Sequence, residues 1–250
     1  MLVKHFVFGP IETNCYLVAC EKTRDAMVVD PDVRTKEEKD KLSSAINKPK
    51  IKLRYIVNTH HHSDHTSGNS ILKKATGAEI LIHELDAAVL PKPWEWWSKM
   101  IKTDPRRPCP ACGNEGSNHV EILNGQEKAV LSCNACGLRF EIFSSPPADR
   151  LLHHGDVIIV GELEFVVIHT PGHSAGGISL YSKKEKAVFT GDTLFKGSVG
   201  RTDTIDSSCE DIIRSVKELS KLPEDTVVYP GHGETTTISE EKCNNPFLQN

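Results

Sequence analysis

The chain has 250 residues, of which 38% are hydrophobic and 26% charged, and its formal net charge is −4. This length accommodates one substantial domain, or one domain that carries a small second one, and the composition is that of an ordinary globular protein. The slightly negative charge gives no reason to expect a nucleic-acid surface, and no stretch approaches the roughly 18 apolar residues of a membrane helix.

The first residues alternate modestly between apolar and polar and reach Gly9-Pro10 before a long apolar segment develops. This pattern predicts a strand and a turn rather than a secretory signal. We therefore expect a cytoplasmic protein with no membrane partner, and the sequence leaves a homo-oligomer open.

Apolar runs bounded by turn residues predict strands and helices in both halves of the chain. Strands are expected at 3–8, 15–19, 26–29, 51–57, 79–82, 157–160, 165–168, 178–181, 187–190 and 226–229. Helices are expected at 35–46, 67–75 and 208–219, the last with apolar residues at helical spacing. Strands mixed with helices in this way indicate a layered α/β architecture.

The composition changes between residues 91 and 147. This segment contains seven of the chain's 14 prolines, all three tryptophans and two Cys-x-x-Cys pairs. Regular strands stop before it and resume after it, so we interpret it as an inserted module with boundaries at its proline-rich edges. The expected domains are therefore 1–90 with 148–250, discontinuous, and 91–147.

The sequence His60-His61-His62-Ser63-Asp64-His65 follows directly after a predicted strand. A strand end followed by a tight turn can direct His60 and His62 to one point and Asp64 and His65 to an adjacent one, in which case His61 must point away. Imidazole and carboxylate groups suit zinc, iron or manganese.

Three further loops repeat this pattern, because each has a strand followed by a ligand candidate beside a glycine. The candidates are His173, Asp192 and His232, preceded by Gly172, Gly191 and Gly231. A glycine at such a place lets the backbone turn sharply and approach a metal closely. Four loops with compatible ligand types predict one metal centre.

These motifs identify a resemblance to the metallo-β-lactamase superfamily, and within it to the short glyoxalase II-like hydrolases. The similarity covers residues 1–90 and 148–250. It rests on the segments 13–18, 29–31, 59–68, 169–173, 190–195, 197–203, 230–233 and 245–248.

The resemblance implies an αββα sandwich with an edge site for two divalent metals, zinc or iron. It assigns one metal to His60, His62 and His173, the other to Asp64, His65 and His232, and Asp192 to a bridge between them. It also implies that Asp30 braces the histidine loop through hydrogen bonds, a supporting role that suits a carboxylate at a strand end.

The reaction expected of such a centre is hydrolysis, in which a hydroxide shared by the two metals attacks a carbonyl carbon of a small-molecule substrate. Asp64 is the candidate catalytic residue that orients the water and takes its proton. A thioester or related small ester is the expected substrate, with a lactone or phosphoester as alternatives. The additional C-terminal region with which glyoxalase II enzymes bind glutathione is not expected here.

Persulfide dioxygenases are similar in the same motifs but use a single iron for oxidation. A non-haem iron oxidoreductase is therefore the alternative function. A third hypothesis is a protein that processes or binds nucleic acid and recognises it through the insertion, although the insertion has no strong basic stripe.

The insertion has the spacing C-x₂-C-x₂₀-C-x₂-C, from Cys109, Cys112, Cys133 and Cys136. This spacing resembles that of zinc ribbons and, less closely, of rubredoxins, and it predicts one four-cysteine zinc site, with iron as the competitor. Such a closed site is structural. We expect the module to cap the metal centre or to contact another subunit, with Trp94, Trp96 and Trp97 as apolar surface.

Overall fold

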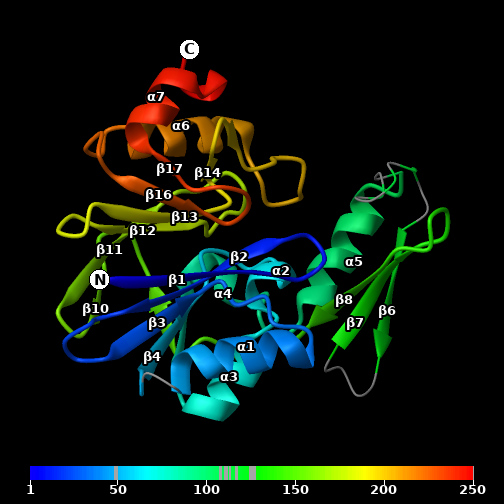
Figure 1. Ribbon diagram of the computed structural model, residues 1–250. Coiled ribbons are helices and arrows are strands. Elements are labelled where there is room, and N and C mark those ends of the chain that lie inside the picture. Colours follow the sequence, from blue (N-terminus) through cyan, green and yellow to red (C-terminus); the bar gives the residue numbers. More distant parts are fainter. Residues whose placement is uncertain are drawn as a thin grey trace.

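The computed structural model of the chain describes residues 1–47, 50–106, 109, 112, 114–115, 118–123 and 128–249. Two six-stranded sheets pack face to face, and helices cover the outer face of each (Figure 1). This arrangement is the αββα sandwich, so the predicted fold class is confirmed. No helix in the described part of the chain combines the length and apolar character that a membrane crossing requires.

The first sheet has the strand order β1-β2-β3-β4-β5-β9. Its strands are β1 (Leu2–Phe8), β2 (Thr13–Ala19), β3 (Asp25–Val29), β4 (Lys52–Val57), β5 (Glu79–His83) and β9 (Arg150–Leu152). The β1, β2 and β3 pairings are antiparallel, whereas β3, β4, β5 and β9 run parallel. The residues that follow β3 and β4 therefore meet at one edge of the sheet.

Strand β2 shows why this sheet lies between two layers. Side chains of successive strand residues point to opposite faces. Cys15 and Leu17 contact the cluster beneath α1 (Lys36–Asn47) and α3 (Asn69–Thr76), whereas Tyr16 and Val18 contact the cluster between the sheets. Every residue of β2 is buried, which explains the uninterrupted apolar run from Cys15 to Ala19.

The second sheet has the order β10-β11-β12-β13-β16-β17. Its strands are β10 (Val157–Val160), β11 (Leu163–His169), β12 (Ile178–Ser182), β13 (Ala187–Gly191), β16 (Val227–Pro230) and β17 (Thr236–Thr237), with β14 (Leu194–Phe195) and β15 (Ser198–Val199) as a separate hairpin. Because β13 and β16 are parallel, the loops that follow them also emerge at one edge.

Two helices, α6 (Cys209–Leu219) and α7 (Ile238–Asn244), cover the outer face of this second sheet (Figure 1). The Ser208 side chain accepts a hydrogen bond from the Asp211 backbone N–H and so caps α6. Its apolar face, with Ile212 and Val216, is buried. Three shorter helices complete the sandwich. α2 (Ser63–Thr66) follows β4, α4 (Glu84–Ala87) follows β5, and the 3₁₀ helix η2 (Pro246–Leu248) follows α7.

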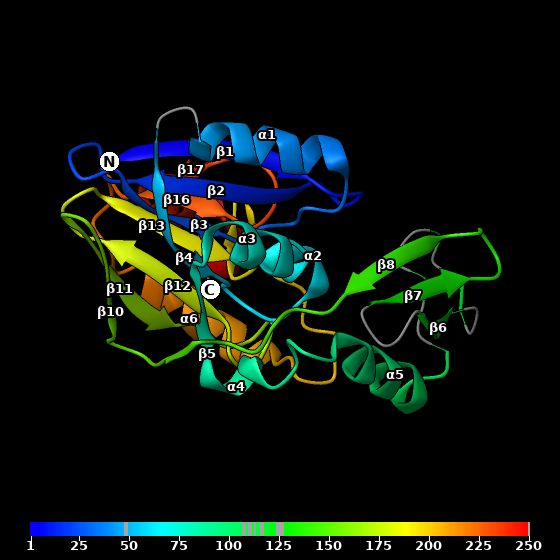
Figure 2. The ribbon, with the colours of Figure 1, turned by 90° about the horizontal axis from the view of Figure 1, so that it is seen from below.

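The insertion contains α5 (Pro93–Thr103) and a three-stranded antiparallel sheet of β6 (Asn118–Leu123), β7 (Lys128–Cys133) and β8 (Arg139–Phe143). Figures 1 and 2 both place it beside the sandwich. It has a core of its own, in which Trp94 packs with residues of β7 and β8. The composition predicted an insertion but not these strands, and the division at residues 90 and 148 stays a prediction.

Tyr16 of the first sheet and Pro230 of the second are joined by one of the hydrogen bonds that connect the two sheets near the metal-ligand candidates. The hydroxyl of the buried Tyr16 donates to the Pro230 carbonyl at 2.8 Å. We expect Tyr16→Phe to lower the free energy of unfolding by about 1 kcal/mol, because the carbonyl keeps its second donor, Asn14 Nδ2. Urea unfolding measures this change.

The matched control is Tyr55→Phe, which removes a hydroxyl that has no hydrogen-bond partner among the described residues. A loss of stability as large in Tyr55→Phe as in Tyr16→Phe would contradict the assignment.

Candidate metal centre

The loop after β4 carries three consecutive histidines, and their side chains alternate in direction. His60 and His62 approach each other, with His60 Nε2 3.0 Å from His62 Nδ1. His61 points away, and its Nε2 lies 2.8 Å from Asp206 Oδ2. The prediction that His61 points away is therefore confirmed.

The first group of ligand candidates consists of His60, His62 and His173. His173 Nε2 lies 2.9 Å from His62 Nδ1, so three imidazole nitrogens converge on one point. The second nitrogen of His60 contacts Thr59 Oγ1 at 3.1 Å, and that of His173 contacts the Arg201 carbonyl at 2.9 Å. Such partners fix the orientation of an imidazole that binds a metal.

The second group consists of Asp64, His65 and His232. Asp64 Oδ2 lies 3.1 Å from His65 Nε2 and 3.4 Å from His232 Nε2. Asp192 lies between the groups, since its Oδ1 is 3.5 Å from His65 and its Oδ2 is 3.4 Å from His173 Nε2. The structure thus brings all seven predicted side chains together from four loops.

These side chains fit a metal in their chemistry as well as their position. His65 Nε2 and Asp192 Oδ1 are buried and have no hydrogen-bond partner among the residues the structure describes. Buried polar atoms are normally paired, and an unpaired one at such a place calls for an ion or water. Nitrogen and carboxylate oxygen are ligands that zinc and iron accept.

The protonation of the first group also suits metal binding. Burial, together with the neighbouring imidazoles, holds the pKa of His60 well below its usual range. Burial and the charges of His173 and His61 do the same for His62. Both rings are therefore neutral near pH 7, the form in which a histidine binds a metal.

The Asp30 carboxylate supports the ligand loop at both ends. It accepts hydrogen bonds from the Thr59 backbone N–H at 2.8 Å and from the Thr59 hydroxyl at 2.6 Å. Its Oδ2 also lies 3.0 Å from His65 Nδ1, so it orients that ring. The bracing role expected for Asp30 is confirmed.

The four cysteines of the insertion also converge. Cys109 Sγ lies 3.8 Å from Cys136 Sγ, Cys112 Sγ lies 3.9 Å from Cys133 Sγ, and none of the four is part of a disulfide. Four sulfurs around an ion in tetrahedral geometry, each at ~2.3 Å, lie ~3.8 Å apart. The cluster therefore has the dimensions of a metal site.

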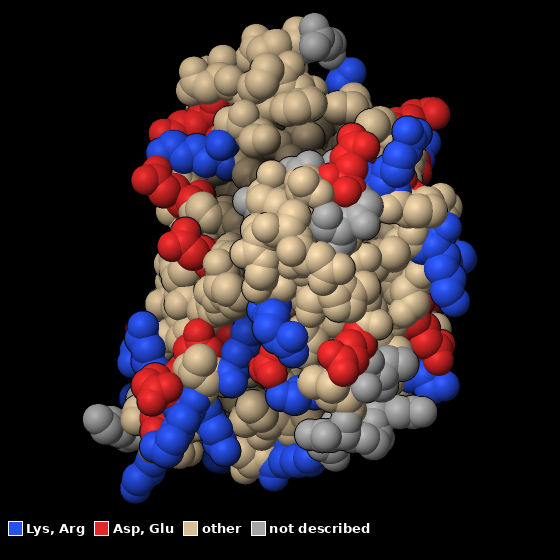
Figure 3. Space-filling model, turned by 90° about the vertical axis from the view of Figure 1, so that its right-hand side faces the viewer, with Lys and Arg blue, Asp and Glu red and all other residues tan. Residues whose placement is uncertain are grey.

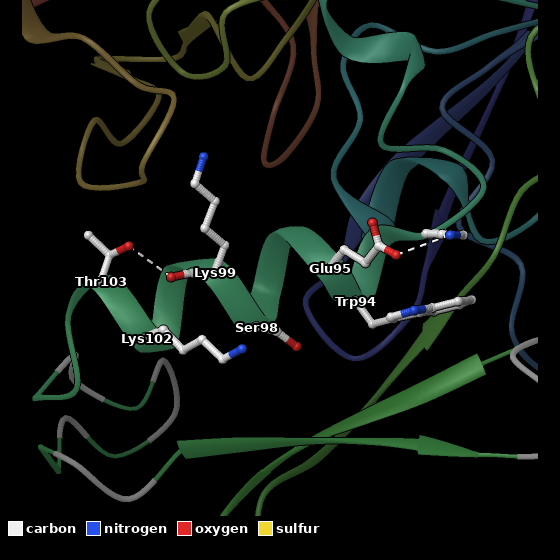
Figure 4. A pocket seen from close by; sticks show the side chains of 7 residues that line it. Trp94, Glu95, Ser98, Lys99, Lys102 and Thr103 are labelled. Carbon is white, nitrogen blue, oxygen red and sulfur yellow. Dashed lines mark hydrogen bonds and ion pairs between the residues drawn. The ribbon is translucent and has the colours of Figure 1, made fainter.

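A cavity of about 500 Å³ lies along α5, apart from both clusters (Figure 4). Its lining residues all come from residues 92–103 and include none of the ligand candidates. This cavity is therefore separate from the candidate metal centre.

The sequence matches the family model of the metallo-beta-lactamase superfamily over residues 8–232. The chain belongs to this superfamily. Among its relatives, a protein of Aquifex aeolicus (strain VF5) is 34% identical over 99% of this chain and 97% of its own length. The hydroxyacylglutathione hydrolase GloC of Haemophilus influenzae is 28% identical over 95% of this chain and 93% of its own length.

Solved structures of the superfamily agree with the fold. The B3 metallo-beta-lactamase BLEG-1 is 29% identical and superposes with a TM-score of 0.75 over 100% of both chains. TTHA1623 in a di-iron-bound form is 27% identical, with a TM-score of 0.72 over 98% of this chain and 100% of its own. ETHE1 from Myxococcus xanthus is 25% identical, with a TM-score of 0.67 over 98% of this chain and 84% of its own.

Several residues around this superfamily site were not found from the sequence. Asp206 and Asp86 bind the side chain and backbone of His61, and Arg34 contacts the Ser63 carbonyl. Each lies in a different part of the chain, and no spacing rule connects it to the histidine motif. Trp96, by contrast, was expected as part of the apolar surface of the insertion, and it packs on His62.

Gly231 tests the geometry of the superfamily site. A Cβ at this position would lie 2.2 Å from Asp192 Oδ1 and 2.9 Å from His65 Cε1. We expect Gly231→Ala to displace these two side chains and to reduce the metal content of the site, which elemental analysis measures. Gly233→Ala is the control, because its Cβ would meet no atom within 4 Å. In this control, alanine in the left-handed conformation of Gly233 costs about 1 kcal/mol of stability, and we expect the metal content to be unchanged.

The second group of ligand candidates predicts a pH dependence of metal binding. Burial lowers the pKa of His65, but the charges of Asp64 and Asp192 outweigh it and raise the pKa well above its usual value. Burial also lowers the pKa of His232, but its hydrogen bond to Asp64 and the charges of Asp192 and Asp64 together outweigh it and raise the pKa. Below these raised pKa values both rings hold protons that a metal must displace.

We therefore expect the affinity for the second metal to rise by at least about tenfold per pH unit between pH 6 and 8, since each proton released contributes a factor of ten per unit. Competition with a chelator measures it. An affinity that stays constant over this range would contradict the expected proton release.

Proposed function

We propose that the chain is a two-metal hydrolase that acts on a small thioester or ester. The observation that carries the proposal is the assembly of two complete ligand groups around Asp192. A mononuclear oxidase of the persulfide dioxygenase type needs only one of these groups. The second, formed by Asp64, His65 and His232, would hold the second ion that a two-metal hydrolase uses.

A bound pair of divalent cations supplies an activated water and polarises the substrate carbonyl. With the metals bound, the chain's own contribution to the reaction would be the Asp64 carboxylate. Burial would raise the pKa of Asp64, but His65 and His232 outweigh it and hold the pKa well below its usual range. Asp64 is therefore ionised, and Thr13 Oγ1 donates to its Oδ2 at 3.3 Å. This carboxylate orients the water and accepts its proton in the attack.

The substrate class rests on the relatives. One similar protein is a hydroxyacylglutathione hydrolase, which supports a thioester as the substrate of this chain. ETHE1 from Myxococcus xanthus is similar in structure and supports the second candidate, a non-haem iron oxidoreductase acting on persulfides.

On the face shown in Figure 3, Lys and Arg side chains lie among Asp and Glu side chains rather than in a continuous basic surface. A surface that binds a phosphate backbone needs a basic stripe. This charge pattern supports a small-molecule substrate.

In the insertion we propose a structural zinc ion bound by Cys109, Cys112, Cys133 and Cys136. The sulfur spacing described above supports zinc, and thiolate ligands also accept iron. We expect about three metal ions per chain, two at the sandwich edge and one in the insertion. Elemental analysis of protein purified without added metal measures them. In Cys112→Ser we expect one ion fewer and an unchanged pair at the sandwich edge.

Two assays separate the candidate reactions. We expect hydrolysis of a glutathione thioester without oxygen consumption, and no oxygen consumption with glutathione persulfide. Oxygen uptake with the persulfide, together with one or two irons at the histidine site, would replace the hydrolase with the oxidoreductase.

Asp64→Asn tests the role of the carboxylate. We expect kcat for the thioester to fall by roughly 10²-fold or more, because the amide keeps the size of the side chain but neither accepts the proton nor balances the metal charge. Asp225→Asn is the control. Asp225 is exposed and pairs with Lys186, and it precedes β16, whereas the ligand candidate His232 follows that strand. Equal losses in both variants would contradict the assignment.

A further inference from the structure

We propose that Trp96, on α5 of the insertion, is a positioning residue of the metal centre that fixes the His62 imidazole. This inference rests on the proposed two-metal site, and it makes the insertion part of that site.

His62 is held differently from the other two imidazoles of its group. The second nitrogens of His60 and His173 each have a polar partner, as described above. His62 Nε2 is buried and has no hydrogen-bond partner among the described residues. A ligand that lacks such a partner is oriented by packing alone, so the group that packs on it determines its direction.

Trp96 is the packing group on the insertion side. Its ring centroid lies 5.0 Å from that of His62 at an angle of 57°, and 5.1 Å from that of His61 at 67°. These separations are those of aromatic pairs in contact. Trp96 is half-buried, so part of the indole lies between the imidazoles and solvent.

The indole is itself held in place. Its Nε1–H donates to Asp206 Oδ1 at 3.2 Å, while Asp206 Oδ2 lies 2.8 Å from His61 Nε2. The His61 backbone N–H donates to Asp86 Oδ2 at 3.1 Å, so His61 is fixed independently of Trp96. Asp206 therefore joins the indole to a histidine whose two neighbours in the chain are ligand candidates.

A second contact fixes the insertion against the same loop. Arg34, largely buried, donates to Asp32 at 2.6 Å, to the Glu141 carbonyl of β8 at 2.5 Å and to the Ser63 carbonyl at 3.4 Å. Its guanidinium also lies 4.3 Å from the centroid of the Phe140 ring. The insertion thus contacts the ligand loop at His61 and His62 through α5, and Arg34 links β8 to Ser63, so Trp96 has a defined position relative to the site.

The test uses cobalt binding to the full chain. The cysteine cluster is first loaded with zinc, and cobalt is then added. The absence of a thiolate-to-cobalt charge-transfer band shows that cobalt has not entered the cysteine cluster, and the appearance of visible bands shows that it is bound by the histidine and carboxylate ligands. The affinity for cobalt is measured by chelator competition, and the visible absorption bands report the ligand geometry. Neither readout needs a substrate.

We expect Trp96→Ala to weaken cobalt binding by about 10-fold or more and to change the visible spectrum, as loss of a supporting contact to a ligand does. Trp96→Phe keeps a ring on His62 and loses the bond to Asp206. It is expected to restore most of the affinity.

Trp94→Phe is the matched control on the same helix. Figure 4 shows Trp94 on the side of α5 that faces the strands of the insertion, and it packs in the core of the insertion. We expect this variant to leave the affinity and the spectrum unchanged.

Wild-type affinity and spectrum in Trp96→Ala would overturn the inference, and so would a change in Trp94→Phe as large as that in Trp96→Ala. Failure of every thioester assay together with the expected cobalt result would overturn the proposed reaction and leave the role of Trp96 standing.

Discussion

The carboxylate of Asp30 is the constraint on which the metal centre depends. Only 2% of this residue is exposed, and its backbone has a φ of 50°, a conformation that costs a non-glycine residue about 1 kcal/mol or more. The contacts to Thr59 and His65 offset that cost. Because Thr59 precedes the histidines and His65 ends the motif, one buried side chain determines where the whole loop begins and ends.

The two ligand groups have opposite electrostatic characters in the protein without metal. His60 and His62 are kept neutral by burial, whereas His65 and His232 take up protons beside Asp64 and Asp192. The first group therefore presents free lone pairs to an incoming cation, and the second must exchange protons for it. The two positions are chemically unequal before any metal arrives, which gives the order of loading a physical basis.

Sequence patterns predicted those parts of the molecule that local rules control. The continuous apolar run of β2 and the histidine motif after β4 follow from strand periodicity and ligand chemistry, and the structure places them as expected. The strands β6 to β8 were missed because the cysteine pairs between and beside them indicate a metal-bound module and say nothing about strands. Trp96 was expected as part of the apolar surface of the insertion, but its contact with Asp206 was missed, because the contact joins segments 110 residues apart and no local pattern encodes such a pair.

The insertion leaves and rejoins the sandwich at almost the same point. The Ser145 backbone N–H donates to the Leu90 carbonyl at 2.9 Å, and β5 and β9, which flank the insertion in the chain, are neighbours in the first sheet. A short turn between these two residues would therefore close the sandwich without any change in strand order. Because both ends of the insertion lie at this one place, another segment could replace it, and with it the contact of Trp96 with His62, while the ligands and the sheets that carry them remain the same.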